Sequence, residues 1–149
     1  MSPAALKETG ASLTEVVLAM GIIGLAATLG VEGLGGIVAR SEGRAAATAL
    51  AGELRTARLH ATMRRELVRV AIDIQHSTVR TEPADAPGQA LRELSIQERG
   101  VMIEDSSAGP SIIFYPSGRV ATPTTITLRN RRSERWRLTV TMTGRVTIQ

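Results

Sequence analysis

The sequence predicts an α+β protein in which one long N-terminal helix, transmembrane in its first part and amphipathic in its second, packs on antiparallel β-strands. Three observations support this. An uncharged apolar run stands near the N-terminus, a helical apolar stripe follows it, and the remainder alternates apolar and polar residues as strands do. With 149 residues the chain is long enough for one domain with its own core.

The helix begins with a run of sixteen uncharged residues, Val16 to Val31. It covers about 24 Å, less than the roughly 30 Å hydrocarbon core of a bilayer. Extending it back to Ala11 gives twenty-one residues, enough to span, and includes Glu15. A carboxylate within a membrane helix costs about 2.5 to 3.5 kcal/mol on insertion scales and is usually paired. Alternatively, Glu15 lies at the head-group boundary; both interpretations fit a helix that begins near Ala11.

This run is not an ordinary secretory signal, in which cleavage follows the apolar region at small residues. Here the run continues into Glu32 and further helical sequence without a clear A-x-A site. The polar break precedes it instead, at residues 7–10.

Residues 9–24, TGASLTEVVLAMGIIG, resemble the type IV prepilin signature. In that family a membrane peptidase, which is also a methyltransferase, cuts after the glycine on the cytoplasmic side and methylates the new terminal amine. The resemblance implies cleavage between Gly10 and Ala11 and N-methylation of Ala11. The family usually has Phe or another bulky residue where Ala11 stands.

Cleavage would free an ammonium four residues before Glu15, about one helical turn away. When helices pack, the Glu15 carboxylate could meet the Ala11 ammonium of a neighbouring subunit. A close pair in low dielectric is strongly favoured over two unpaired charges. We therefore expect Glu15 to set the register of subunit assembly.

The topology is taken from the resemblance. The positive-inside rule, which compares Lys7 before the apolar run with Arg40 and Arg44 after it, leans slightly the other way. The resemblance implies a single-pass inner-membrane protein with a cytoplasmic N-terminus. Residues 1–10 are then the leader, 11–39 the transmembrane helix with a glycine-rich hinge, and 40–149 the periplasmic domain. The glycines of the hinge suggest equally a loop or bend where the chain leaves the bilayer or a segment that melts during assembly. They are Gly30, Gly33, Gly35 and Gly36.

From Ser41 the helical pattern resumes and ends near Arg65. Leu50, Leu54, Ala57 and Ala61 fall on one face, which predicts a core stripe. The charged residues Glu53, Arg55, Arg64 and Arg65 are expected elsewhere on the helix.

The remainder predicts strands separated by turns. Residues 68–74 form the clearest alternation, and residues 81–89, with two prolines and a glycine, predict a polar loop. The sequence predicts a closing hairpin around Thr143-Gly144. Further strands are expected at residues 91–96, 101–103, 112–115, 126–128, 136–140 and 146–148.

A second resemblance covers the rest of the chain. FYPSGR (residues 114–119), ITL (126–128), WRLTV (136–140) and TGRV (143–146), with LRTARLHA (54–61) before them, resemble the GspH/FimT family. That family implies a pilin-like fold and a minor subunit that assembles with other pilins or pseudopilins in a filament. One branch serves type II secretion, which is the favoured interpretation; in the other, some type IV minor pilins bind DNA for uptake.

Charge supports the DNA-binding alternative in part. After Pro116 a single acid, Glu134, stands against seven arginines, yet a strand face with solvated arginines explains them as well. The DNA-binding branch carries Gly-Arg-x-Arg, and here Thr147 stands in place of the second arginine. Aromatic residues for stacking are also scarce. The candidate DNA contacts are Arg129, Arg131, Arg132, Arg135 and Arg145.

Nothing in the sequence predicts an enzyme, a cofactor or a metal site. The chain lacks cysteine, which excludes disulfides and thiolate ligands and leaves the redox compartment open. His60 and His76 stand sixteen residues apart without a metal-binding pattern, and no phosphate-loop or nucleophile-elbow pattern is present.

Overall fold

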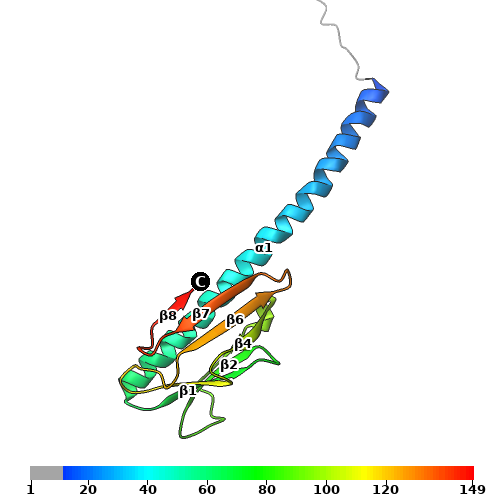
Figure 1. The fold of residues 1–149 in the computed structure, drawn as a ribbon. Coiled ribbons are helices and arrows are strands. Elements are labelled where there is room, and N and C mark those ends of the chain that lie inside the picture. The colour runs from blue at the N-terminus through cyan, green and yellow to red at the C-terminus, as the bar shows by residue number, and fades with distance from the viewer. Residues whose placement is uncertain (1–11) are drawn as a thin grey trace, which may run out of the picture. The chain divides into compact units, whose positions relative to one another are not determined.

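The computed structural model of the protein describes the backbone of residues 12–149 and the side chains of residues 12–26 and 35–149. The predicted leader, 1–10, and Ala11 lie outside the described residues. One long helix precedes eight strands (Figure 1). The elements are α1 (Leu13–Arg64), β1 (Val68–Asp73), β2 (Thr78–Pro83), β3 (Arg92–Ser95), the 3₁₀ helix η1 (Gln97–Arg99), β4 (Val101–Ser106), β5 (Ser111–Phe114), β6 (Thr124–Asn130), β7 (Arg135–Val140) and β8 (Val146–Ile148).

The backbone of α1 is helical without interruption through the glycine-rich segment. The sequence allowed a loop there, and the backbone is helical instead. Each interior glycine costs a helix about 1 kcal/mol relative to alanine, which the strong helix formers on both sides can offset. The chain leaves the helix at Arg65, whose φ of 56° is left-handed. The interpretation of the segment as one that melts during assembly stays a prediction.

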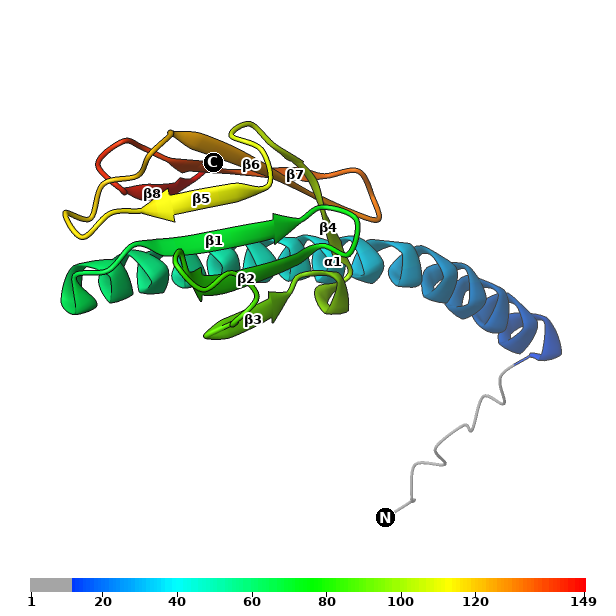
Figure 2. The same ribbon diagram turned by 90° about the horizontal axis from the view of Figure 1, so that it is seen from below.

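Two units divide the chain, residues 1–37 and residues 38–149. The second contains two four-stranded antiparallel sheets, in the orders β3-β2-β1-β5 and β4-β6-β7-β8. The chain moves to the second sheet at β4, returns to the first at β5, and moves back at β6. Figure 2 shows β1 running beside the second half of α1.

One core joins both sheets to the helix. The predicted stripe of Leu50, Leu54, Ala57 and Ala61 is completely buried, as predicted. Further alanines on this face let the sheets approach closely, since a methyl group occupies little space. The strands contribute alternate residues, such as Val68, Val70 and Ile72 of β1, so their other faces stay polar.

The strand predictions are largely confirmed, including the closing hairpin of β7 and β8. The loop predicted at residues 81–89 is wrong at its start, because β2 continues through Thr81 and Glu82 to Pro83. These two polar residues are buried and pair in register with Val70 and Arg69 of β1. The polar residues and prolines of this stretch are typical of a loop, yet β2 lies inside the sheet between β3 and β1. β4 is also longer than predicted and extends to Ser106.

Glu53 corrects another expectation. The sequence predicts it elsewhere on the helix than the buried stripe, but it is only 5% exposed. The Thr81 hydroxyl donates to its Oε1 at 2.8 Å, and Nε of Arg92 lies 3.1 Å from its Oε2. Strands β2 and β3 therefore cover this flank of α1. A carboxylate tolerates such burial only because it is hydrogen-bonded and paired.

Candidate functional sites: the apolar helix and the arginine groups

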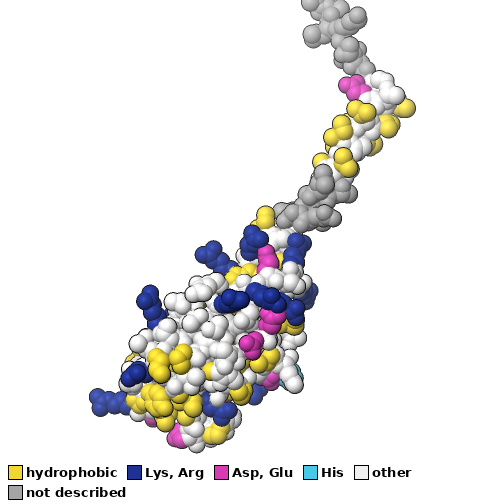
Figure 3. Space-filling view, in the orientation of Figure 1, with side chains coloured by type: hydrophobic (Ala, Val, Ile, Leu, Met, Phe, Trp, Pro, Cys, Tyr) yellow, Lys and Arg dark blue, Asp and Glu magenta, His cyan; other side chains and the backbone are white. Residues whose placement is uncertain are grey.

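Apolar side chains are exposed along the first turns of α1, and Figure 3 shows them on the face in view. Leu13 is 83% exposed, and the neighbouring pairs Val17 with Leu18 and Ile22 with Ile23 are exposed too. Consecutive residues of a helix point about 100° apart, so the apolar surface extends around the helix. A helix that is hydrophobic all round is normally buried in a larger apolar environment. This segment therefore needs a lipid or protein surrounding that the isolated chain does not supply.

In the part of the chain whose side chains are described, no helical stretch is both long and apolar enough to cross a membrane. The side chains of residues 27–34, which belong to the predicted span, lie outside that part. The cleavage and methylation predicted at Gly10 and Ala11 fall outside the described residues too.

Glu15 lies in the first turn of α1, exposed to solvent. Its backbone N–H donates to the Ser12 carbonyl at 2.9 Å, which starts the helix. The amino end of a helix carries partial positive charge, so a carboxylate is favourable there within its own chain as well. Its pairing with a neighbouring subunit stays a prediction.

The five arginines predicted as DNA contacts do not form one surface. Arg129 of β6 and Arg135 of β7 are register partners and share Glu104 of β4. Arg135 binds that carboxylate through two hydrogen bonds, of 2.7 and 2.8 Å. They lower the pKa of Glu104 and raise the pKa of Arg135. The charge of this pair is thus partly neutralised within the sheet.

Arg131 and Arg132 lie in the turn between β6 and β7, which Asn130 organises. Its Oδ1 accepts the backbone N–H groups of Arg132 and Glu134, both at 3.0 Å. Its Nδ2 donates to the Ala39 carbonyl at 3.3 Å, which fixes the turn against α1. Glu134 also binds Arg40 at 2.8 Å, and hydrogen bonds from Arg40 and Asn130 lower its pKa.

Arg145 lies in the turn between β7 and β8, at the opposite end of β7. Its neighbour Gly144 packs closely on Gly118 and on Arg58, whose Nε donates to the Gly118 carbonyl at 3.0 Å. Arg55 donates to the carbonyl of Val146 at 3.2 Å. This end gathers the four arginines Arg55, Arg58, Arg119 and Arg145, which we call the distal arginine group.

No acid in the described part of the chain forms an ion pair with the distal arginine group. Its positive charge is therefore less compensated than that of Arg129 and Arg135. The sequence did not point to Arg55 and Arg58, because they stand more than fifty residues before Arg119 and only folding brings them to the same turns.

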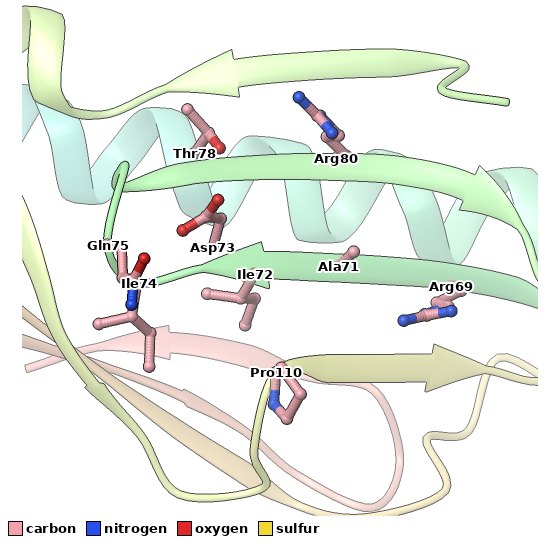
Figure 4. Close-up of a pocket in the computed structure, with 9 residues that line it drawn as sticks. All are labelled: Arg69, Ala71, Ile72, Asp73, Ile74, Gln75, Thr78, Arg80 and Pro110. Carbon is pink, nitrogen blue, oxygen red and sulfur yellow. The ribbon is translucent and has the colours of Figure 1, made fainter. Parts of the chain in front are cut away.

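His60 lies in α1 and His76 in the turn between β1 and β2. The His76 ring lies 2.8 Å from Asp73 in an exposed turn, and hydrogen bonds from the backbone N–H of His76 and from its ring lower the pKa of that carboxyl. A hollow of about 420 Å³ lies beside β1 and β2 (Figure 4). Its arginines, Arg69 and Arg80, already pair with glutamates. Within the described residues no group of three His, Cys, Asp or Glu side chains could hold a metal ion.

Comparison with solved structures finds the same fold in a minor pilin and a minor pseudopilin. The type IV minor pilin FimU of Pseudomonas aeruginosa PAO1 aligns with a TM-score of 0.63 at 16% identity, over 74% of this chain and 90% of that one. The minor pseudopilin EpsH of the Vibrio cholerae type 2 secretion system aligns with a TM-score of 0.59 at 20% identity, over 72% and 96%. At these identities the likeness concerns the fold.

A search of curated proteins found no match. The family model of type II transport protein GspH, in contrast, matches residues 46–144. That match covers most of the described core, from the buried alanines of α1 to the turn at Gly144. The chain therefore belongs to the GspH family and has the pilin-like fold of minor pilins and pseudopilins.

Proposed function

We propose that the protein is a minor pseudopilin of a type II secretion system, a filament subunit that assists protein export across the outer membrane. In this proposal the prepilin peptidase removes residues 1–10 and methylates Ala11. Residues 11–39 then anchor the subunit in the inner membrane, and residues 40–149 form its periplasmic domain. Its partners are other pseudopilins, which take up the apolar helix when the filament forms.

One observation supports this proposal most: the apolar first part of α1 is exposed on all sides and carries a single acid, Glu15, in its first turn. A lipid bilayer can cover such a helix before assembly, and neighbouring helices can cover it afterwards. The acid would be costly in either surrounding unless it is paired. A free amine at Ala11 of an adjacent subunit supplies that partner.

Replacing Glu15 by glutamine should reduce incorporation into filaments about tenfold or more, since loss of the charge leaves the neighbouring ammonium unpaired in an apolar surrounding. Filaments sheared from cells that carry the complete secretion system measure this by immunoblot. Glu42→Gln is the matched control, an exposed glutamate of the same helix beyond the predicted span. Wild-type assembly by Glu15→Gln would remove the electrostatic basis of the proposal.

Replacing Gly10 by valine should block processing, because the peptidase would meet a branched side chain at the residue before the scissile bond. Co-expression with a prepilin peptidase, followed by mass spectrometry, distinguishes a chain that begins at methylated Ala11 from the intact one. A wild-type chain that keeps its first ten residues would instead indicate a plain membrane-anchored domain.

A type IV minor pilin that binds DNA is the second candidate function, and the distal arginine group favours it. Four arginines without an acidic ion-pair partner could neutralise several phosphates, which gives salt-sensitive, sequence-independent binding. Arg119 together with Arg58 could supply the charge that the incomplete Gly-Arg-x-Arg motif lacks.

A mobility-shift assay with the double variant Arg119→Gln/Arg145→Gln tests this candidate. If DNA is bound, the variant should bind more weakly, and the dependence of affinity on salt should fall by about two phosphate contacts. Arg129→Gln/Arg135→Gln is the control, because Glu104 already binds both arginines. Wild-type protein without salt-dependent DNA binding would leave secretion as the function.

A further inference from the structure

Two arginines of α1 follow the predicted membrane segment directly. Arg40 and Arg44 stand one and five residues beyond residue 39, so they lie within about 8 Å of its end along the helix. Both are exposed, and the Arg40 side chain is 77% exposed. The head-group region of a bilayer extends about 5 to 8 Å beyond the hydrocarbon on each side. Arg40 and Arg44 are at head-group depth if the hydrocarbon ends at residue 39. If it ends at Val31, where the uncharged run ends, Arg40 lies nine residues, about 14 Å, beyond it and meets the surface only when the domain leans toward the bilayer.

The fold brings further arginines to the same level. The hydrogen bond from Asn130 to the Ala39 carbonyl and the ion pair of Glu134 with Arg40 hold the β6–β7 turn beside this part of α1. Arg131 and Arg132 are exposed in that turn. Arg99 of η1 joins them, because Ala39, Arg99 and Arg131 all line one hollow of about 210 Å³.

We call this surface the basic collar: Arg40, Arg44, Arg99, Arg131 and Arg132. Figure 3 shows arginines gathered, with some acids among them, on the end of the domain that contains the β6–β7 turn. Three glutamates, Glu42, Glu98 and Glu134, accompany the five arginines and leave a net charge of +2. In the described part of the chain only Arg40 among the five forms an ion pair. The other four form no ion pair there, although the charge of Arg132 helps to lower the pKa of Glu134.

Guanidinium groups bind phosphates through paired hydrogen bonds, and each basic residue near an anionic membrane surface contributes about 1 kcal/mol of attraction. Phosphate occurs both in lipid head groups and in nucleic acids. The position of the basic collar favours lipid, because two of its arginines follow the predicted transmembrane helix and hinge, 11–39, within five residues. The distal arginine group, at the other end of β7, has no such connection to the membrane.

We infer that the basic collar binds anionic phospholipid head groups and holds the periplasmic domain against the inner membrane before the subunit enters a filament. The inference rests on the membrane anchoring proposed above. It adds a lipid preference and a preferred orientation to a subunit whose apolar helix alone would insert into neutral and anionic bilayers alike.

Trp136 provides a built-in reporter. It is the only tryptophan of the chain, and its indole packs over Gly43 of α1, between Arg40 and Arg44 in sequence. The full chain is reconstituted into vesicles of phosphatidylcholine, with or without phosphatidylglycerol, that contain a lipid with a nitroxide quencher on its head group. Phosphatidylglycerol should increase the quenching of Trp136 about twofold, and high salt should remove the increase.

Arg131→Gln/Arg132→Gln should abolish the increase, whereas the control Arg119→Gln/Arg145→Gln should retain it. All four positions are exposed, and unchanged urea unfolding verifies the fold. Equal quenching in both vesicle types, or an increase that survives the first variant, overturns the inference. The inference is also overturned if Arg131→Gln/Arg132→Gln loses DNA binding while the quenching of Trp136 is unchanged.

Flotation after a carbonate wash tests the membrane anchoring separately. Failure to insert would refute both the anchoring and the lipid contact. Insertion without an effect of phosphatidylglycerol would refute only the lipid contact.

Discussion

Gly144→Ala should lower the free energy of unfolding by about 3 kcal/mol. Gly144 has a φ of +73°, a left-handed conformation that costs a residue with a Cβ about 1 kcal/mol or more. A Cβ at this position would also overlap the Gly118 carbonyl oxygen and press on Arg58. The obstruction is backbone, so it cannot rotate aside, and overpacking of this kind adds about 1 to 3 kcal/mol. Urea unfolding of the full chain in mild detergent measures the loss.

Gly109→Ala is the matched control for this prediction. Gly109 has a similar φ of +83°, but nothing lies within 4 Å of the Cβ it would gain. It should therefore show only the conformational cost, about 1 kcal/mol. If both variants lose the same stability, the close approach of the Gly118 and Gly144 turns does not contribute, and the geometry of the distal arginine group would need revision.

Gly43→Ala should destabilise the protein by about 2 kcal/mol, although alanine is the better helix former. A Cβ at Gly43 would overlap the Trp136 indole, which packs flat on this gap in the α1 surface. The ring would have to leave its position, and β7 would lose part of its contact with the helix. Unfolding experiments give the stability, and a red shift of Trp136 fluorescence would report the displaced ring.

Gly52→Ala, in the same helix, should change the stability in the opposite direction to Gly43→Ala. Nothing lies within 4 Å of a Cβ at Gly52, so the substitution should stabilise the protein by about 1 kcal/mol through helix propensity alone. A stabilising effect at both positions would show that Trp136 does not rest on Gly43 in solution.

Periodicity determined most of the fold from the sequence. The stripe of Leu50, Leu54, Ala57 and Ala61 and the alternation of β1 were readable because burial repeats at the period of the helix or the strand. The polar members of the core were not readable. Glu53 and Thr81 are buried because they bond to each other across 28 residues of sequence, and no local pattern contains that partner.

Of the candidate sites too, one could be predicted from local sequence and the others depend on the tertiary structure. The prepilin-like segment around Glu15 is a continuous stretch of sequence, so the sequence alone pointed to it. The five candidate DNA-contact arginines are close in sequence, but the tertiary structure places them on different surfaces. A strand places its two ends far apart, so Arg131 and Arg145, at opposite ends of β7, serve different surfaces. Arg129 and Arg135, on neighbouring strands, both form ion pairs with Glu104. The helix α1 places Arg40 beside the β6–β7 turn and Arg58 beside the turn at Gly118. Which charges act together depends on through-space distance, and only the packed fold determines it.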